Sequence, residues 1–328
     1  MTFKPRLVDF FKHHILAPQV NRQDRWEQSV FDMPGSTRGN ENSPSRFSIP
    51  RAAIALKGDH VPLPGFPGSA PHMAGSTFNI RKSIFDLEKN PDNGKKRIDA
   101  QTLNELYSFA RSSGASDIGF CRVPQEWVFK NLAIRYTNAI VLTLEMDKAR
   151  MDLAPNPDTA VMVHETYNQL GQTANKIAGW LRKQGFAAHA GHPLGGMALY
   201  PPMAQAAGLG WRGISGLLVT PRFGPRVRLA AVFTEIENLP FYNGSEHSWI
   251  LDFCQTCRRC IRDCPADAFY DQPIYHQNNG LITVIDNARC FPYFAKNHGC
   301  SVCIKVCPFN QHEYSKIKAG FNNKLHDG

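Results

Sequence analysis

Eight cysteines near the end of the chain have the spacing of iron–sulfur ligands. The first run is Cys254, Cys257, Cys260 and Cys264, spaced C-x2-C-x2-C-x3-C before Pro265; the second is Cys290, Cys300, Cys303 and Cys307, which repeats the end of the pattern before Pro308. In the bacterial ferredoxin spacing, three thiolates of a run hold one [4Fe–4S] cluster and the fourth crosses to a second cluster. The sequence therefore predicts two clusters that carry electrons one at a time.

The same spacing predicts which thiolates share a cluster. The first thiol group is Cys254, Cys257, Cys260 and Cys307. The second thiol group is Cys264, Cys290, Cys300 and Cys303. A ninth cysteine, Cys121, lies in an apolar stretch, where we expect a buried thiol and not a ligand.

Two other uses of cysteine fit the chain less well. Disulfide frameworks are typical of small secreted domains, whereas this chain has 328 residues and no recognisable secretory signal. A structural zinc ion takes one group of four ligands, whereas the cysteines here form two groups. We therefore interpret the eight cysteines as cluster ligands.

Composition and charge limit the class of protein. The chain is 42% hydrophobic, and no apolar run approaches the roughly 20 residues that span a bilayer. We expect a cytoplasmic protein with no membrane partner, because reduced thiols and cluster assembly are favoured in the cytoplasm. The net charge of +9 could attract nucleic acid, an anionic substrate or an acidic electron carrier. The absence of an Arg-rich tract or RNA-binding motif argues against nucleic acid.

The pattern along the chain predicts three parts. Residues 1–97 are expected to form an irregular extension wrapped on the body, residues 98–245 the catalytic core, and residues 246–328 the cluster domain. Glycines and prolines crowd residues 58–75, which predicts neither a helix nor a central strand there. Aromatic residues in the extension argue against disorder.

Apolar periodicity predicts regular structure in the middle part. Helices are expected over 100–113 and 160–184, and strands over 117–121, 139–146, 216–220 and 229–236. The run Ala139–Met146 is apolar almost throughout, as in a strand that is covered on both faces. Alternating strands and helices predict an α/β core.

Several fragments together carry a family likeness. They are Trp127-Val128, Tyr136–Val141, Glu145–Asp147, Ala154-Pro155, Gly185-Phe186, Ala207–Gly210, Thr220–Leu229 and the start of the cysteine module at Phe253. In order and spacing, over about residues 100–310, they resemble the reductive dehalogenases, which are corrinoid enzymes with two [4Fe–4S] clusters. Epoxyqueuosine reductase has a related architecture, with an acidic residue before the tyrosine of its long helix and a C-terminal helical-repeat extension. This chain has Thr166 before Tyr167 and ends soon after Cys307, which favours the dehalogenases.

The resemblance implies an α+β fold with two components. A nitroreductase-like α/β core would bind cobalamin, and a C-terminal ferredoxin-like module would hold the two [4Fe–4S] clusters. The family binds cobalamin in its base-off form and leaves the lower face of the corrinoid unligated. The chain agrees with this, because it has no D-x-H-x-x-G sequence to supply a histidine ligand.

The resemblance also implies a proton donor. A buried tyrosine beside a cation can give up a proton because the cation stabilises the resulting phenolate. Tyr167 matches the family's tyrosine near the start of the long helix, although core packing is the alternative for an aromatic residue there. The family pairs its tyrosine with Lys or Arg. Arg226 is the best positional match, and Arg222 and Arg228 are rivals.

Cofactor contacts are expected between the long helix and Ala207. His189 and His192 stand where some family members carry asparagine, and either could donate to a halide, a carboxylate or a corrinoid amide. A histidine in a turn is the alternative. Four glycines could let the backbone approach a large flat cofactor, or could simply serve turns: Gly195, Gly196, Gly208 and Gly210.

Three functions fit these observations, and we favour the first. It is a cobalamin-dependent reductive dehalogenase that acts on a small organohalide and takes electrons from an external ferredoxin or flavodoxin. The second is an epoxyqueuosine reductase-like tRNA-modifying enzyme, whose binding would depend steeply on salt. The third is a two-cluster electron-transfer protein, which would leave the large core without a use.

Overall fold

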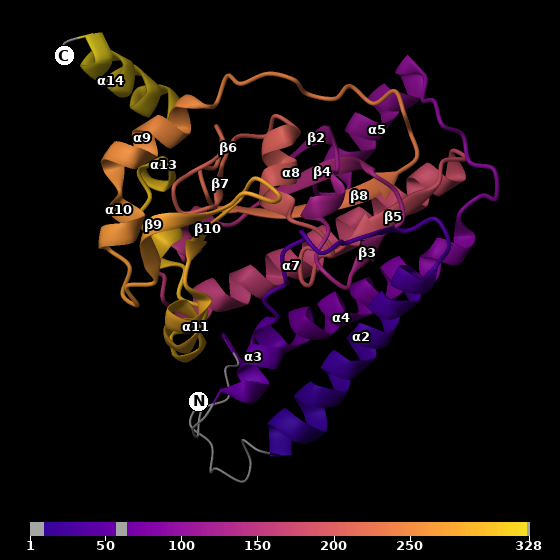
Figure 1. Ribbon diagram of the computed structural model, residues 1–328, viewed down its shortest axis with the longest axis horizontal. Coiled ribbons are helices and arrows are strands. Elements are labelled where there is room, and N and C mark those ends of the chain that lie inside the picture. The colour runs from indigo at the N-terminus through magenta and orange to yellow at the C-terminus, as the bar shows by residue number, and fades with distance from the viewer. Residues whose placement is uncertain (1–9, 57–63, 327–328) are drawn as a thin grey trace.

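The computed structural model describes residues 10–56 and 64–326 (Figure 1). Expectations for residues 1–9, and for residues 58–63 of the glycine- and proline-rich stretch, lie outside the described residues. None of the helices in the described ranges combines the length and the apolar composition that crossing a membrane requires.

The helices follow one another along the whole described chain. In order they are η1 (Phe11–Leu16), α2 (Ala17–Asp32), α3 (Ile49–Ala55), α4 (Ala70–Phe85), η2 (Asp86–Lys89), α5 (Ala100–Ser112), η3 (Gln125–Trp127), α6 (Lys148–Met151), α7 (Pro157–Lys183), α8 (Tyr200–Ala206), α9 (Trp249–Cys257), α10 (Arg259–Arg262), α11 (Asn287–Lys296), α12 (Val302–Lys305), α13 (Pro308–Gln311) and α14 (Tyr314–His326). The expected helices over 100–113 and 160–184 are confirmed as α5 and α7.

The strands form one central sheet and three small pairs. They are β1 (Thr37–Arg38), β2 (Asp117–Arg122), β3 (Ala133–Ile134), β4 (Asn138–Glu145), β5 (Ala188–Gly191), β6 (Trp211–Arg212), β7 (Leu218–Val219), β8 (Val227–Thr234), β9 (Phe269–His276) and β10 (Leu281–Ile285). The central order is β2-β4-β8-β5, with every neighbouring pair antiparallel. Helices and strands are thus mixed as expected, but the alternation does not build a parallel sheet. The strand expected over 216–220 is the short β7, outside the central sheet.

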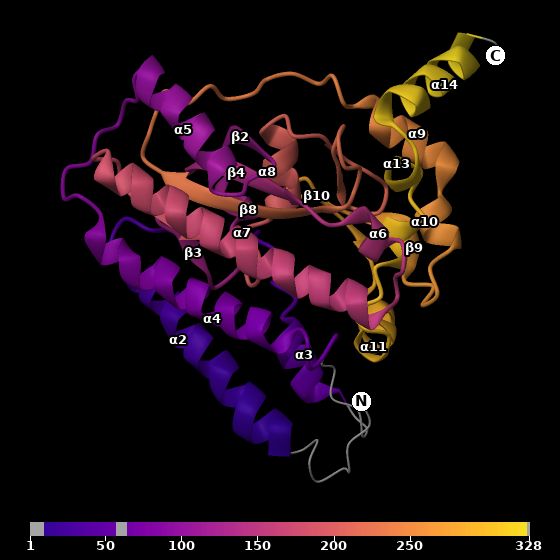
Figure 2. The same ribbon diagram turned by 180° about the vertical axis from the view of Figure 1, so that it is seen from behind.

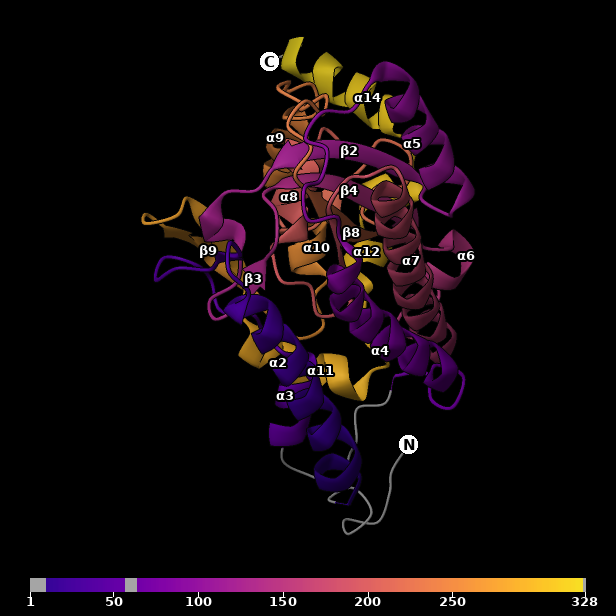
Figure 3. The same cartoon turned by 90° about the vertical axis from the view of Figure 1, so that its right-hand side faces the viewer.

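Helices cover both faces of the central sheet (Figure 3). Successive residues of a strand point to opposite faces. Ile140 and Leu142 of β4 accordingly pack against α5 and α7, whereas Ala139 and Val141 pack on the α8 side. These four side chains are fully buried, which explains why the sequence of β4 is apolar almost throughout. Cys121 of β2 is also buried, as expected.

The long helix α7 begins and ends at clear local signals. The side chain of Asn156 accepts a hydrogen bond from the backbone of Asp158, and Pro157 occupies the first turn. Gly185 follows the helix with φ of +86°, the left-handed conformation that commonly ends a helix. Helix α7 crosses the molecule from the central sheet toward the end that holds the C-terminal helices, as Figure 2 shows.

Much of the described N-terminal part is helical, which corrects the expectation of an irregular extension. Helices α2 and α4 run alongside α7, with α4 next to it (Figure 2). Proline is tolerated in the first helical turn, so Pro71 does not prevent α4 from forming. Gly75 lies inside α4 because it faces Asn168 of α7, where a Cβ atom would stand 2.5 Å from the side-chain oxygen. Tertiary packing therefore outweighs the local glycine and proline signal.

Helices α9 to α14 and the β9–β10 hairpin gather at one end of the molecule (Figure 1). Polar contacts fix this end to the segment before α7. The Lys305 ammonium donates to the carbonyl oxygen of Ala154 at 2.7 Å, and the Asn310 amide donates to the Asp152 carboxylate at 2.8 Å. The cysteine module is therefore attached where α7 begins.

Truncation of a buried β4 side chain tests this account of the core. Leu142→Ala should lower the free energy of unfolding by about 2–5 kcal/mol, because it removes a fully buried side chain and leaves a cavity. Leu153→Ala is the matched control, since Leu153 is 51% exposed. Urea denaturation compares the two variants. Equal losses would contradict the assignment of β4 to the centre of the core.

Candidate active site and cluster ligands

The eight cysteines of the two runs lie on short helices and the turns between them. Cys254 and Cys257 belong to α9, Cys260 to α10, Cys290 to α11 and Cys303 to α12. Arg258, Cys300 and Ser301 have positive φ, which turns the chain sharply between neighbouring cysteines. All eight thiols are free and partly buried.

The thiols of the first group influence one another electrostatically. The pKa of the Cys254 thiol is raised to about 12, mainly by burial and further by the charges of Cys260 and Cys257. The pKa of Cys307 is also raised, by burial and then by the charges of Cys254, Cys260 and Cys257. Because only nearby charges have such an effect, these four thiols form one neighbourhood.

The thiols of the second group also influence one another's pKa values electrostatically. Burial raises the pKa of Cys303 to about 12, and the charges of Cys300, Cys260, Cys290 and Cys264 add to it. Three of these four belong to the second group, and Cys260 is the neighbour from the first. The thiols of the two runs therefore lie near one another, and the division into two groups stays a prediction.

No three His, Cys, Asp or Glu side chains within residues 10–56 and 64–326 converge on a point where one metal ion would bind. The thiolates of a four-iron cluster bind different irons and therefore do not need to converge. The donor set of four thiols in each group fits such a cluster.

Tyr167 of α7 meets a cation, but that cation is Arg228 of β8. The guanidinium Nη1 donates to the phenol oxygen at 2.9 Å, and its central carbon lies 4.2 Å from the ring centroid. The other terminal nitrogen lies 3.0 Å from the sulfur of Met146. No carboxylate of the described residues forms an ion pair with Arg228. Its charge is therefore directed at the tyrosine.

Arg226, the arginine favoured from the sequence, does not contact Tyr167. Its guanidinium lies 2.5 Å from the Glu145 carboxylate and also donates to the Met146 carbonyl at 3.1 Å. The expected pairing of Tyr167 with Arg226 is thus corrected to Arg228. Both arginines stand two residues apart on one chain segment, and the position where β8 meets α7 decides which one reaches the phenol. Arg222 is 63% exposed and pairs with Asp117 at the surface.

An apolar cluster links the second thiol group to this tyrosine. Cys303 and Val163 both pack against a cluster of buried apolar side chains that includes Met146, and Val163 lies one turn before Tyr167 on α7. Met146 also contacts the Arg228 guanidinium. The same apolar cluster therefore borders both the second thiol group and the Tyr167–Arg228 pair.

His164 lies beside the pair and was not singled out from the sequence. Its ring centroid is 6.2 Å from that of Tyr167, and its Nδ1 has no hydrogen-bond partner among the described residues. Burial, followed by the charges of Arg228 and His72, lowers its pKa to about 4. The imidazole is thus neutral at pH 7. The sequence could have indicated this neighbour, because His164 stands three residues before Tyr167 and so lies on the same side of the helix.

The two histidines expected near a cofactor are buried inside the protein. Burial lowers the pKa of both His189 and His192 to about 3, so both are neutral at pH 7. The His192 Nδ1 accepts a hydrogen bond from the Leu194 backbone at 3.0 Å, while its Nε2 faces Gly171 of α7. A Cβ atom on Gly171 would stand 2.0 Å from that nitrogen. His192 therefore packs against α7 one turn after Tyr167.

Two of the expected cofactor glycines serve the packing of the protein itself. A Cβ atom on Gly208 would meet the ring of Tyr242 at 2.7 Å. One on Gly210 would meet the carbonyl oxygen of Val219 at 2.2 Å. The close approach that these glycines permit is therefore to other parts of the chain.

The other two glycines lie near a buried ion pair. Arg46 forms two hydrogen bonds with the Glu27 carboxylate, at 2.7 and 2.9 Å, and Glu27 is almost fully buried. Arg46 also donates to the Gly195 carbonyl at 3.0 Å and lies near that of Gly196. This clamp of Arg46 and Glu27 ties the N-terminal part to the loop after His192.

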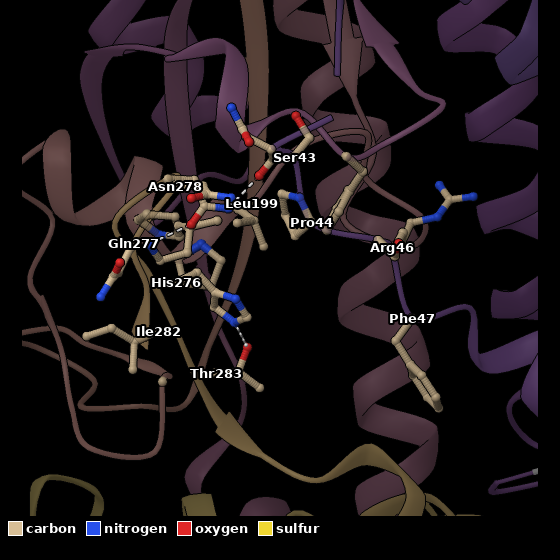
Figure 4. A pocket seen from close by; sticks show the side chains of 18 of the residues that line it. Ser43, Pro44, Arg46, Phe47, Leu199, His276, Gln277, Asn278, Ile282 and Thr283 are labelled. Carbon is tan, nitrogen blue, oxygen red and sulfur yellow. Dashed lines mark hydrogen bonds between the residues drawn. The ribbon is translucent and has the colours of Figure 1, made fainter. Parts of the chain in front are cut away.

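Two cavities meet at Arg46 and Phe47. One of about 390 Å³ is lined by Tyr167, by Leu194 and Gly195, by mostly apolar side chains of α4 and by mostly polar side chains of α2. The other, of about 840 Å³, lies between segment 41–47, Leu199 and the β9–β10 hairpin, as Figure 4 shows. Ligand pockets have volumes of roughly 300–1,000 Å³, so both are large enough to hold a ligand.

Known proteins resemble this chain over most of its length. No protein-family profile matches it. A tetrachloroethene reductive dehalogenase of Desulfitobacterium hafniense is 30% identical over 323 residues, which cover 94% of this chain and 56% of the relative. An epoxyqueuosine reductase of Atelocyanobacterium thalassa is 30% identical over 116 residues, covering 33% of this chain and 36% of the relative. The chain thus spans about half the length of the dehalogenase.

The fold is also similar to a solved structure. A catabolic reductive dehalogenase superposes with a TM-score of 0.61 at 17% identity, covering 88% of this chain and 45% of that protein. At this level of identity the likeness concerns the fold. It extends from the core into the cysteine module.

Two substitutions on α7 test the packing beside Tyr167. Gly171→Ala should lower the free energy of unfolding by about 1–3 kcal/mol, because the new methyl group collides with His192. Gly179→Ala should instead raise it by up to about 1 kcal/mol, because nothing lies within 4 Å and alanine favours the helix. Chemical denaturation of both variants measures the difference. A stabilising Gly171→Ala would contradict the contact with His192.

Proposed function

Since the chain is a homologue of the reductive dehalogenases, which are related to the epoxyqueuosine reductases, we propose that it removes halogen from an organohalide. The carbon–halogen bond breaks and a carbon–hydrogen bond forms. An organohalide, two electrons and one proton give the dehalogenated product and one halide ion. The enzyme would therefore be an oxidoreductase that needs an electron path and a proton donor at one place.

The observation that carries this proposal is the Tyr167–Arg228 contact beside the second thiol group. The Tyr167 hydroxyl would give the proton to the product carbon. Arg228 would stabilise the phenolate that remains, because its guanidinium both hydrogen-bonds the oxygen and stacks on the ring. His164 is neutral and therefore adds no competing positive charge at the pair.

The two thiol groups would hold two [4Fe–4S] clusters. The first cluster would be bound by Cys254, Cys257, Cys260 and Cys307. The second would be bound by Cys264, Cys290, Cys300 and Cys303, and it would lie next to Met146 and Val163. Electrons would thus pass from the cluster at the first thiol group to the cluster at the second, and from there to the active site. An external ferredoxin or flavodoxin would supply them.

The cavity beside Tyr167 fits part of a large cofactor such as base-off cobalamin. Its walls at Leu194 and Gly195 would pack on the cofactor, and Phe47 connects it with the larger cavity. A bound corrinoid would supply a low-potential centre that breaks the carbon–halogen bond, while the protein supplies position and electrostatics. Gly208 and Gly210 have no part in this proposal, because they do not line the cavity.

One observation argues against the tRNA-modifying alternative. Thr166 stands where the epoxyqueuosine reductases are expected to have an acidic residue before the tyrosine. Its hydroxyl donates to the Val163 carbonyl within α7 and is buried. It therefore offers no carboxylate beside Tyr167.

Cofactor reconstitution followed by a halide assay tests the proposal. Clusters and cobalamin are reconstituted without oxygen, and halide release is measured with reduced viologen on tetrachloroethene and on bromophenols. We expect cobalamin binding and halide release. Cobalamin binding with queuosine formation on tRNA, and no halide release, would select the second function. Cluster assembly without cobalamin binding would leave an electron-transfer protein.

Substitutions of the pair give a sharper prediction. Tyr167→Phe should bind both cofactors yet lose roughly 100-fold or more in turnover, since a general acid contributes about 10²–10⁴-fold. Arg228→Gln should show a loss of similar size, because the phenolate loses its cation. Arg226→Gln should lose much less, because Arg226 faces Glu145. Halide release per bound cobalamin is the measure, and a larger loss in Arg226→Gln than in Arg228→Gln would contradict the assignment.

A further inference from the structure

The chain around the first thiol group carries an exposed positive surface. Between Gln255 and Arg262, where α9 passes into α10, three arginines are exposed and no carboxylate is present. We call Arg258, Arg259 and Arg262 the arginine surface. Cys257 and Cys260 of the first thiol group lie within the same stretch. In Figure 1 α10 stands at the outer edge of the molecule.

The positive charge of this surface is only partly compensated. Arg258 makes no ion pair and no side-chain hydrogen bond with the described residues. Arg262 donates to the Cys257 carbonyl at 3.2 Å, which ties it to the ligand loop without neutralising it. Arg259 lies 3.4 Å from the Asp263 carboxylate. At least two of the three guanidinium groups are thus available to a negatively charged partner.

The surroundings of the second thiol group are different. Arg289, next to Cys290, lies near both Asp286 and Asp267, at 3.6 and 4.0 Å, so its charge is balanced by carboxylates. Cys303 of this group packs into the apolar cluster with Met146 and Val163, toward the core. The second group is therefore oriented toward the cluster beside Tyr167, and the arginine next to its Cys290 is balanced by carboxylates.

We propose that the arginine surface is the docking site for a small acidic protein that carries low-potential electrons, such as a flavodoxin, and that electrons enter at the first thiol group. This inference rests on the proposed function, which places a [4Fe–4S] cluster at each group. At each encounter the reduced carrier loses one electron and the first cluster gains it. Two encounters supply the two electrons that one dehalogenation consumes. Opposite charges speed such encounters and set their orientation.

Stopped-flow reduction of the reconstituted full chain tests the docking site. Reduced flavodoxin is the probe, and bleaching of the cluster absorption is followed without any organohalide. At low salt, Arg258→Glu should slow the second-order reduction roughly tenfold or more, and added salt should remove the difference. Arg289→Glu is the matched control, with the same charge reversal beside a ligand of the second group, and should stay within about twofold of the wild type.

Further measurements keep the outcome decisive. The extent of reduction by dithionite shows whether each variant holds its clusters. Arg258→Glu is the deciding variant, because the Arg258 side chain makes no polar contact in the described part of the chain, whereas Arg262 is bonded to the Cys257 carbonyl. Calorimetric binding of oxidised flavodoxin should weaken in Arg258→Glu and not in Arg289→Glu. Wild-type rates in Arg258→Glu, or slowing only in Arg289→Glu, would overturn the docking site.

The docking site and the proposed function fail in distinguishable ways. Halide release with reduced viologen reports the dehalogenation without a protein carrier. Normal halide release with no effect of Arg258→Glu on flavodoxin would reject the docking site alone. Intact clusters with no halide release, and a strong effect of Arg258→Glu, would reject the dehalogenation alone. Absence of clusters would reject both.

Discussion

The contact between the Arg228 guanidinium and the Tyr167 phenol is the interaction on which the proposed chemistry depends. The phenol must be close to a cation that no carboxylate has already neutralised. The fold meets this requirement because Glu145 forms its ion pair with Arg226, whereas Arg228 lies between the Tyr167 phenol and the Met146 sulfur. A neutral His164 completes the surroundings. In the proposed function, the way β8 packs against α7 therefore determines which arginine reaches Tyr167.

The other parts of the molecule position the surroundings of the Tyr167–Arg228 contact. Helix α4 packs on α7, α2 packs on α4, and both line the cavity beside Tyr167. The Arg46–Glu27 clamp fixes the loop after His192 at the wall of that cavity. On the other side, Lys305 and Asn310 attach the cysteine module to the segment before α7. The cavity, the Tyr167–Arg228 pair and the second thiol group thus all lie near the first half of α7.

Local signals in the sequence predicted much of this arrangement, whereas contacts between distant segments escaped it. Cysteine spacing and the periodicity of α7 are local, so the thiol groups and the helix bearing Tyr167 could be anticipated. The choice between Arg226 and Arg228 depends on where a strand crosses a helix, which spacing does not encode. Helix α4 was not predicted because Gly75 looks like a helix breaker in the sequence. The reason for a glycine there is the close approach of Asn168 of α7, which is distant in the sequence. The neighbours of Gly208 and Gly210 were hidden for the same reason.

Isotope labelling of the product tests the central claim most directly. The reconstituted protein is supplied with reduced viologen and an organohalide in D2O, and product, halide and consumed electrons are counted together. The account predicts one halide for every two electrons, with one deuterium on the carbon that lost the halogen. A product that carries oxygen at that carbon, or halide released without consumption of electrons, would contradict reductive dehalogenation by this chain.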